Sequence, residues 1–257
     1  MNYTLITGAS SGIGEALAVS SAKDGANLIL VGRDESKLRA IKDQVQNLYS
    51  VDVRLIFTDL LAPNAPEHIY KRCLTNGWEV RVLINNAGMG YWGYFDNAPL
   101  EELSELIHIN QTVVISLCHL FLPMLKKVPY PHILNVASTA AYQPIPFFSV
   151  YAATKSFVLS FSRSLRYELK DTKVNVSCLC PGPTDTPFFE KIGFDQINYS
   201  KGAIMKSSEV ADYALQGLIK KKAVITPGFS NAMGTWFSRH MPKTWMISLI
   251  AKFFKPR

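Results

Sequence analysis

The sequence predicts an α/β fold in which a doubly wound, parallel sheet of seven strands carries helices on both faces. Apolar runs of strand length alternate with amphipathic segments of helix length, and this alternation is typical of parallel sheets with right-handed crossovers. Most of the runs are unbroken, as in strands covered on both faces. No linker or repeat divides residues 1–257, so we expect a single domain that ends in a distinct tail, 229–257.

The expected elements follow one another regularly along the chain. Strands are predicted at 3–7, 27–31, 53–57, 81–85, 132–137, 173–179 and 223–226. Helices are predicted at 13–23, 34–47, 64–76, 100–126, 151–170 and 208–221. Ligands of parallel sheets bind at the carboxyl ends of the strands, so the residues that follow each strand are the candidate site residues.

The turn after the first strand reads "GASSGIGEALA" over 8–18. Its glycines permit a sharp turn and a close approach of a phosphate to the backbone. The helix that starts here directs free N–H groups and the positive end of its dipole toward the same space. We therefore expect a pyrophosphate at this turn, and a glycine-rich turn without a ligand is the alternative. The candidate contacts are Gly8, Ser10, Ser11, Gly12, Ile13 and Gly14.

The second strand ends in "LVGRDESKL", where a cofactor with a free ribose 2′-hydroxyl usually meets an acidic side chain. This chain has Arg33 instead. Because a guanidinium binds a phosphate through several donors, Arg33 favours NADP(H) over NAD(H). A solvated arginine at the start of a helix is the alternative.

Six motifs now stand in one order along the chain: "TGASSGIG", "NNAG" (85–88), "HINQT" (108–112), "ILNVAS" (133–138), "YAATK" (151–155) and "CPGPTDT" (180–186). In order and spacing they resemble the short-chain dehydrogenase/reductase family, over residues 3 to about 228. The resemblance implies a Rossmann fold, a nicotinamide cofactor and interconversion of carbonyls and alcohols. The resemblance is to the compact members of the family, which have no C-terminal substrate domain.

Tyr151 and Lys155 lie four residues apart, so a helix places both on one face. A tyrosine is normally neutral at pH 7, and reduction of a ketone needs a proton donor. A fixed ammonium nearby would stabilise the phenolate and bring the tyrosine pKa toward the working pH. The pair therefore suits acid/base chemistry.

The resemblance assigns roles to four catalytic residues. It implies that Tyr151 is the acid/base and that Ser138 hydrogen-bonds the substrate oxygen. It implies that Lys155 lowers the tyrosine pKa and binds the ribose hydroxyls, and that Asn110 positions a water for proton relay. The cofactor contacts that it adds to the glycine turn and Arg33 are Asp59, Leu60, Asn86, Ala87, Gly88, Tyr151, Lys155, Pro181, Gly182, Thr184 and Thr186.

Three segments border the expected nicotinamide site: 89–95, 140–148 and 187–194. They are rich in aromatic residues and poor in charge, which favours an apolar substrate held by few polar contacts. An oxoacyl compound, a steroid-like ketone and a xenobiotic carbonyl all fit. Aromatic packing within the loops is the alternative.

The tail carries the basic charge of the chain. The net charge is +7, and no acidic residue follows Asp212. The body is near neutral, which argues against nucleic-acid binding. Residues 243–254 are predicted to form an amphipathic helix too short to span a bilayer. Its apolar face is expected to be buried on a partner subunit, over the substrate pocket or on an anionic membrane surface.

Composition sets further expectations. No secretory signal is seen at the start of the sequence, and no stretch approaches the length and apolarity of a membrane span. The four cysteines have no metal-binding spacing and are expected to be reduced core thiols in a cytoplasmic protein, and no metal site is expected.

We therefore expect an NADP(H)-dependent oxidoreductase that interconverts a carbonyl and a secondary alcohol. The alternatives are an NAD-dependent alcohol dehydrogenase and a non-catalytic protein that senses NADP(H). The apolar faces of helices 100–126 and 151–170 resemble the subunit interface of the family, which implies a homodimer or homotetramer.

Overall fold

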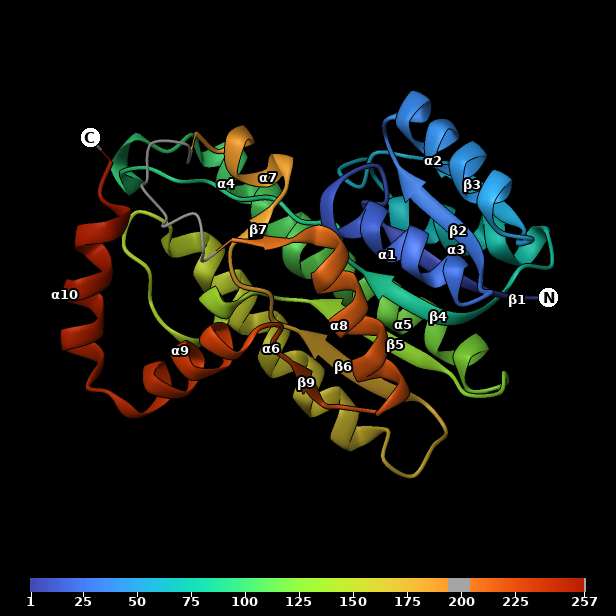
Figure 1. Ribbon diagram of the computed structural model, residues 1–257. Helices are drawn as coiled ribbons and strands as arrows, with labels where there is room; N and C mark the ends of the chain where they lie inside the picture. Colours follow the sequence, from blue (N-terminus) through green and yellow to red (C-terminus); the bar gives the residue numbers. More distant parts are fainter. Residues whose placement is uncertain (194–203, 257) are drawn as a thin grey trace.

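The computed structural model describes residues 1–193 and 204–256, and of Arg239 and Lys243 it describes the backbone alone (Figure 1). A central sheet runs through the molecule and is covered by helices. The two C-terminal helices lie outside these layers, at the end of the molecule opposite the N-terminus (Figure 1).

The sheet has seven parallel strands in the order β3-β2-β1-β4-β5-β6-β9. The strands are β1 Asn2–Thr7, β2 Asn27–Gly32, β3 Val53–Phe57, β4 Glu79–Asn85, β5 His132–Val136, β6 Asn175–Leu179 and β9 Val224–Ile225. The order reverses between β1 and β4, and ligands of such sheets bind outside the carboxyl ends at this point. The predicted doubly wound sheet of seven parallel strands is confirmed.

Helices cover both faces of the sheet, as predicted. On one face lie α1 Gly12–Lys23, α2 Glu35–Leu48 and α8 Ser207–Ile219, whose apolar side chains share a core with β1 and β2. On the other lie α3 Ala65–Thr75, α5 Val113–Leu125 and α6 Ser149–Glu168. Each strand in the middle of the sheet therefore has apolar side chains on both faces, which explains the unbroken apolar runs.

The predicted continuous helix 100–126 is interrupted. It consists of α4 Leu100–Ile107, a π-helical turn His108–Thr112 and α5. The described residues Leu100–Leu125 form a helix long and apolar enough to cross a membrane by length and composition, contrary to our expectation from the sequence. Leu117 and Phe121 of this helix are buried in the core beneath the sheet, as in the core helix of a globular fold.

Short elements complete the carboxyl edge of the sheet. β7 Thr184–Asp185 pairs with β8 Met205–Lys206, and α7 Pro187–Lys191 follows β7. Short 3₁₀ turns occupy Phe95–Asn97 and Thr139–Tyr142. The tail forms α9 Phe229–His240 and α10 Lys243–Phe254, so the helix predicted at 243–254 is confirmed. Pro242 separates the two helices because it cannot continue α9.

Candidate active site

The glycine turn between β1 and α1 is packed too tightly for side chains. Gly8 and Gly12 have φ of +63° and +60°, where other residues are strained. A Cβ on Gly14 would lie 2.2 Å from the Gly8 carbonyl oxygen. Ser11 precedes the helix without a side-chain cap, so it leaves the first N–H groups of α1 to a ligand. The glycine turn and the first N–H groups of α1 together form a concave site, the glycine cradle, that fits a pyrophosphate.

The loop after β4 holds this turn in place. The Asn86 side-chain amide donates hydrogen bonds to the carbonyl oxygens of Thr7 (2.9 Å) and Gly8 (3.1 Å). The Thr7 hydroxyl accepts from the backbone N–H groups of Asn86 and Ala87. The sequence predicts that Asn86 lines the cofactor, and the structure shows its amide bound to the backbone of the turn. It positions the cradle.

Arg33 lies where β2 ends, next to the glycine turn. Its side chain is exposed and lies 3.7 Å from the Asp59 carboxylate, an exposed pair that contributes little to stability. The Ser10 hydroxyl lies 3.7 Å from the point where a Cβ on Gly32 would stand. Arg33 and Ser10 therefore flank one space at the end of β2, which fits a ribose phosphate. Leu60, another predicted cofactor contact, is buried in the core.

The loop after β6 closes the other side of the cradle. A Cβ on Gly12 would lie 2.9 Å from the Thr186 methyl carbon, so the two loops meet. Thr184 is buried and donates to the Gly182 carbonyl oxygen at 2.9 Å. Gly182 packs against Asn231 of α9, whose Oδ1 would lie 2.3 Å from a Cβ on this glycine. Sequence analysis missed Asn231 because no motif marks it.

Tyr151 and Lys155 lie buried on one face of α6, as the spacing predicts. The Lys155 ammonium donates to the Val136 carbonyl oxygen at 2.9 Å and lies 5.6 Å from the centre of the Tyr151 ring. A Cβ on Gly88 would lie 3.3 Å from Lys155 Nζ. Lys155 thus joins the end of β5 to the loop that follows β4.

Burial shifts the pKa values of this pair in opposite directions. Burial raises the pKa of the Tyr151 phenol above its usual value, and a hydrogen bond with Ser138 opposes the rise. Burial lowers the pKa of Lys155 to about 8. Burial is the largest cause for both groups, and Tyr151 holds its proton at neutral pH. The expected lowering of the tyrosine pKa by Lys155 is not seen here, because Lys155 is turned to a backbone carbonyl.

Ser138 follows β5 and faces the tyrosine. Its hydroxyl oxygen accepts from the Ala140 N–H at 3.1 Å, which caps the following 3₁₀ turn. It also lies 3.5 Å from the Pro181 carbonyl oxygen. Because the Ser138 and Tyr151 hydroxyls also hydrogen-bond each other, they lie close enough to contact one substrate oxygen.

Asn110 lies in the π-helical turn and is buried. Its side-chain oxygen accepts from the Met89 N–H, and its amide donates to the Met89 carbonyl and the Thr154 hydroxyl, at 2.9–3.0 Å. It therefore ties the loop after β4 to α6. Such turns often mark functional sites, although composition gave no sign of this one. The relay water stays a prediction.

An aromatic wall surrounds Tyr151. Phe148 stacks on it with ring centres 4.2 Å apart, and Phe188 of α7 lies at 5.5 Å. The wall joins the three segments singled out in the sequence, of which residue 194 lies outside the described residues. Other members are Met89, Tyr91, Trp92, Ala140, Ile145 and Ile192.

Helix α10 supplies the outer part of this wall. Ile250 is buried in the same cluster, with Met246 and Phe254 packed beside it. The Trp92 indole N–H donates to the Phe254 carbonyl oxygen at 2.7 Å. The sequence leaves three places for burial of the tail helix: a partner subunit, the substrate pocket and a membrane surface. The structure shows the second of these for the side of α10 that carries Ile250, which packs in one cluster with Tyr151. Sequence analysis did not identify Phe254 as a site residue.

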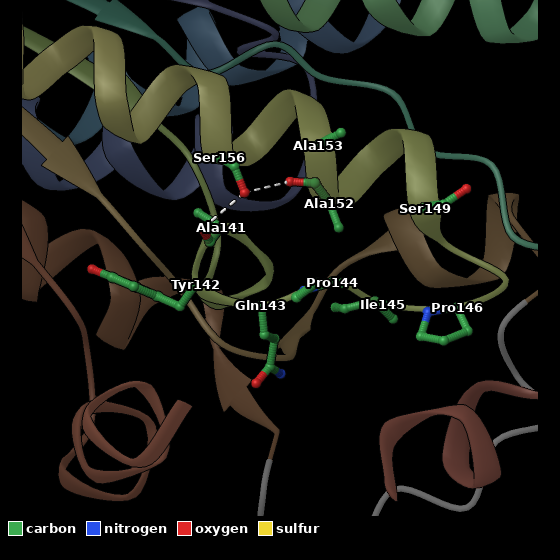
Figure 2. Close-up of a pocket in the computed structure, with 10 residues that line it drawn as sticks. All are labelled: Ala141, Tyr142, Gln143, Pro144, Ile145, Pro146, Ser149, Ala152, Ala153 and Ser156. Carbon is green, nitrogen blue, oxygen red and sulfur yellow. Dashed lines mark hydrogen bonds between the residues drawn. The ribbon is translucent and has the colours of Figure 1, made fainter. Parts of the chain in front are cut away.

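An open pocket of about 560 Å³ lies on another face of α6 (Figure 2). Its walls are the loop 141–146 and small residues of α6, and the Ser156 hydroxyl bonds the Ala141 and Ala152 carbonyl oxygens there. The lining includes neither Tyr151 nor Lys155. The pocket therefore adjoins the wall around Tyr151 through Ile145, but it is not lined by the catalytic group itself.

No cluster of three or more metal-ligating side chains lies in the described residues, 1–193 and 204–256. All four cysteines are buried and free. Burial raises the pKa of Cys73 and Cys118 to about 12, so these thiols are inert.

A Rossmann sheet with a glycine cradle beside a Ser-Tyr-Lys group defines a class of nucleotide-dependent oxidoreductases. The family model described as short chain dehydrogenase matches residues 2–196, and the chain belongs to this family.

Three relatives illustrate the similarity. Human 17-beta-hydroxysteroid dehydrogenase type 3 is 33% identical over 209 residues, 80% of this chain and 66% of that protein, so this chain spans just under two thirds of it. A short-chain dehydrogenase from Sphingobium yanoikuyae, solved in complex with NADPH, is 30% identical with a TM-score of 0.83, over 98% of this chain and 94% of that one. A bulky-bulky ketone specific alcohol dehydrogenase from Comamonas testosteroni is 26% identical with a TM-score of 0.78, over 98% and 92%.

Proposed function

We propose that this protein is an NADP(H)-dependent oxidoreductase that interconverts an apolar ketone and its secondary alcohol. The observation that carries the proposal is the convergence of Ser138, Tyr151 and Lys155 beside the glycine cradle. A protein that only senses NADP(H) has no need of a buried proton donor paired with a buried ammonium. This argues against the non-catalytic alternative.

The cofactor proposal rests on the end of β2. Arg33 is exposed, and its weak contact with Asp59 leaves its donors accessible to a phosphate. The relative from Sphingobium yanoikuyae binds NADPH and is similar over almost the whole chain. Both observations favour NADP(H) over NAD(H). The cradle would hold the pyrophosphate, and Lys155 would bind the ribose hydroxyls.

The chemistry follows from the protonation states. When bound, the reduced nicotinamide supplies a hydride to the carbonyl carbon. Tyr151 is protonated at neutral pH, as a phenol ordinarily is, and burial keeps it so; it can therefore donate that proton to the carbonyl oxygen as hydride arrives. Ser138 donates a hydrogen bond to the same oxygen and orients the carbonyl. In the oxidative direction Tyr151 must take the proton, and a charged Lys155 stabilises the phenolate then formed.

The substrate proposal rests on the wall around Tyr151. Aromatic and aliphatic side chains from four segments surround the phenol, and they include residues of α10. Two relatives carry names that point to steroids and to bulky ketones. We infer a bulky apolar ketone, such as an oxoacyl, steroid-like or xenobiotic compound.

A panel of ketones tests the proposal, with NADPH oxidation followed by its absorbance. Bulky apolar ketones should be turned over with a higher kcat/KM than small or charged ones. Turnover of none of them, with NADPH still bound in a fluorescence titration, would favour the sensing protein.

We further propose a cytoplasmic homo-oligomer, either a dimer or a tetramer. Family members often form oligomers, and the apolar faces of α5 and α6 resemble the subunit interface of the family. Sedimentation of a tagged chain in cell fractions, with and without salt washing, tests the location.

A further inference from the structure

The two C-terminal helices carry a concentration of exposed large apolar side chains. On α10, Trp245, Leu249 and Phe253 are 72%, 53% and 63% exposed. On α9 and just after it, five more are exposed: Phe229, Met233, Trp236, Phe237 and Met241. Exposed apolar residues scattered singly are normal, but eight of them within two adjoining helices indicate an interaction surface.

The pattern on α10 separates two apolar stripes. Met246, Ile250 and Phe254 are spaced by four residues and pack beside the catalytic group. Trp245, Leu249 and Phe253 have the same spacing and form a second, outer stripe next to the first. Among the described residues, 1–193 and 204–256, only the inner stripe is packed against the rest of the protein.

Polar and basic residues border the outer stripe on its other side. Thr244, Ser248 and Lys252 repeat at the same spacing, and Lys252 and Lys255 are exposed. Segment 229–257 contains five basic residues and no acidic one, from the sequence. Tryptophan and phenylalanine beside lysines are typical of helices that lie in a membrane interface.

The charge decides between two occupants of this surface. A second copy would bring the same basic border against itself, and segment 229–257 offers no acidic side chain to pair with it. Like charges brought together oppose such a contact. An anionic lipid surface complements the basic border and accepts the apolar stripe.

We propose that α9 and α10 dock the protein on the surface of an anionic lipid bilayer, with the outer stripe of α10 inserted among the headgroups. Because the inner stripe of the same helix packs beside Tyr151, docking would place the catalytic site near the source of apolar substrates. Docking itself does not depend on turnover, so it stands or fails independently of the proposed reaction.

Vesicle sedimentation of the full chain tests the proposal. The probes are phosphatidylcholine vesicles with and without about 30% phosphatidylglycerol, and binding should be roughly tenfold or more tighter with the anionic lipid. The triple variant Trp245→Gln, Leu249→Gln, Phe253→Gln should weaken binding at least about tenfold, because the inserted apolar area is lost. The double variant Lys252→Gln, Lys255→Gln should weaken it about tenfold on anionic vesicles only.

A matched control changes three apolar residues of similar exposure elsewhere: Leu48→Gln, Leu74→Gln and Leu100→Gln, which are 62%, 53% and 78% exposed. It should bind vesicles as the original chain does, and thermal unfolding should show that every variant is folded. If the triple variant does not fold, the double variant Lys252→Gln, Lys255→Gln still tests the proposal. Equal binding to both vesicle types, no binding at all, or equal loss in the control would overturn the proposal. So would an oligomer that forms without lipid and is dissolved by the triple variant, since it would assign the surface to a second copy.

Discussion

Burial acts on Tyr151 and Lys155 in opposite directions, and in each case it favours the neutral form. For tyrosine the neutral form is the proton donor that reduction requires. For lysine the neutral form loses the charge that would stabilise a phenolate. At pH 7 Tyr151 is therefore the neutral proton donor that reduction requires, while Lys155, with a pKa of about 8, is still mostly charged and can stabilise a phenolate.

Holding Lys155 charged in a buried place costs stability. Its pKa is about 8 in the folded chain against an ordinary value of 10.5, so below pH 8 the ammonium is charged in both states and the folded state bears the full penalty. Lys155→Met should raise the free energy of unfolding at pH 7 by about 1–3 kcal/mol, part of the gain being lost with the bond to Val136.

The sign of the pH dependence provides the control. Between pH 8 and 10.5 only the unfolded state binds the proton, so the stability of the original chain should rise with pH and the advantage of Lys155→Met should shrink. Denaturant unfolding at pH 7 and 9.5 measures both, with the exposed Lys71→Met as a matched variant. A loss of stability at pH 7 in Lys155→Met would contradict the account.

Arg33 should select the 2′-phosphate. A charge-assisted contact of this kind contributes about 1.5–3 kcal/mol, so Arg33→Ala should raise KM for NADPH roughly 10–150-fold and barely change KM for NADH. Steady-state kinetics with both cofactors measure the difference, and Arg39→Ala, another exposed arginine nearby on α2, is the control. Equal effects on the two cofactors would make Arg33 a solvated residue.

At the scale of elements, the strands and the motifs at their ends were predictable because two-sided burial leaves unbroken apolar runs in the sequence. The π-helical turn that holds Asn110 was not, since a shift in hydrogen-bond spacing changes no residue type. Which side of α10 packs against the rest of the protein was not predictable either, because α10 carries apolar residues on two adjacent stripes. Asn231 meets Gly182 through tertiary packing alone.

Helix α10 should shape the substrate site without affecting the cofactor. Removal of residues 244–257 takes away Ile250 and Phe254, which pack with Phe148 beside Tyr151. We expect KM for bulky apolar ketones to rise about tenfold or more, because apolar contact area is lost. The Kd for NADPH should stay the same within about twofold, since the glycine cradle lies at the ends of β1 and β4.

Steady-state kinetics and a fluorescence titration separate the two effects. Phe253→Ser, on the outer stripe of the same helix, is the control and should leave KM unchanged in the absence of lipid. An unchanged KM in the truncated chain would show that α10 does not border the substrate.

At the scale of the whole molecule, α5 and α6 retain apolar groups on their outer sides. Ile115 and Tyr167 are exposed, and Phe157 and Phe161 form a half-buried stacked pair. We expect these helices to form the contact of a homodimer or homotetramer. Light scattering at micromolar concentration should give two or four times the 28.7 kDa of one chain, and Phe157→Ser, Phe161→Ser should reduce it. A single-chain mass for the original protein would contradict the prediction.

The central claim is that Tyr151 donates the proton in a carbonyl reduction, and Tyr151→Phe tests it most directly. The change removes one hydroxyl and keeps the ring that packs against Phe148. With a ketone from the panel and saturating NADPH, kcat should fall about 10²–10⁴-fold, while the Kd for NADPH stays within about twofold. Retention of most of kcat in Tyr151→Phe would contradict the account.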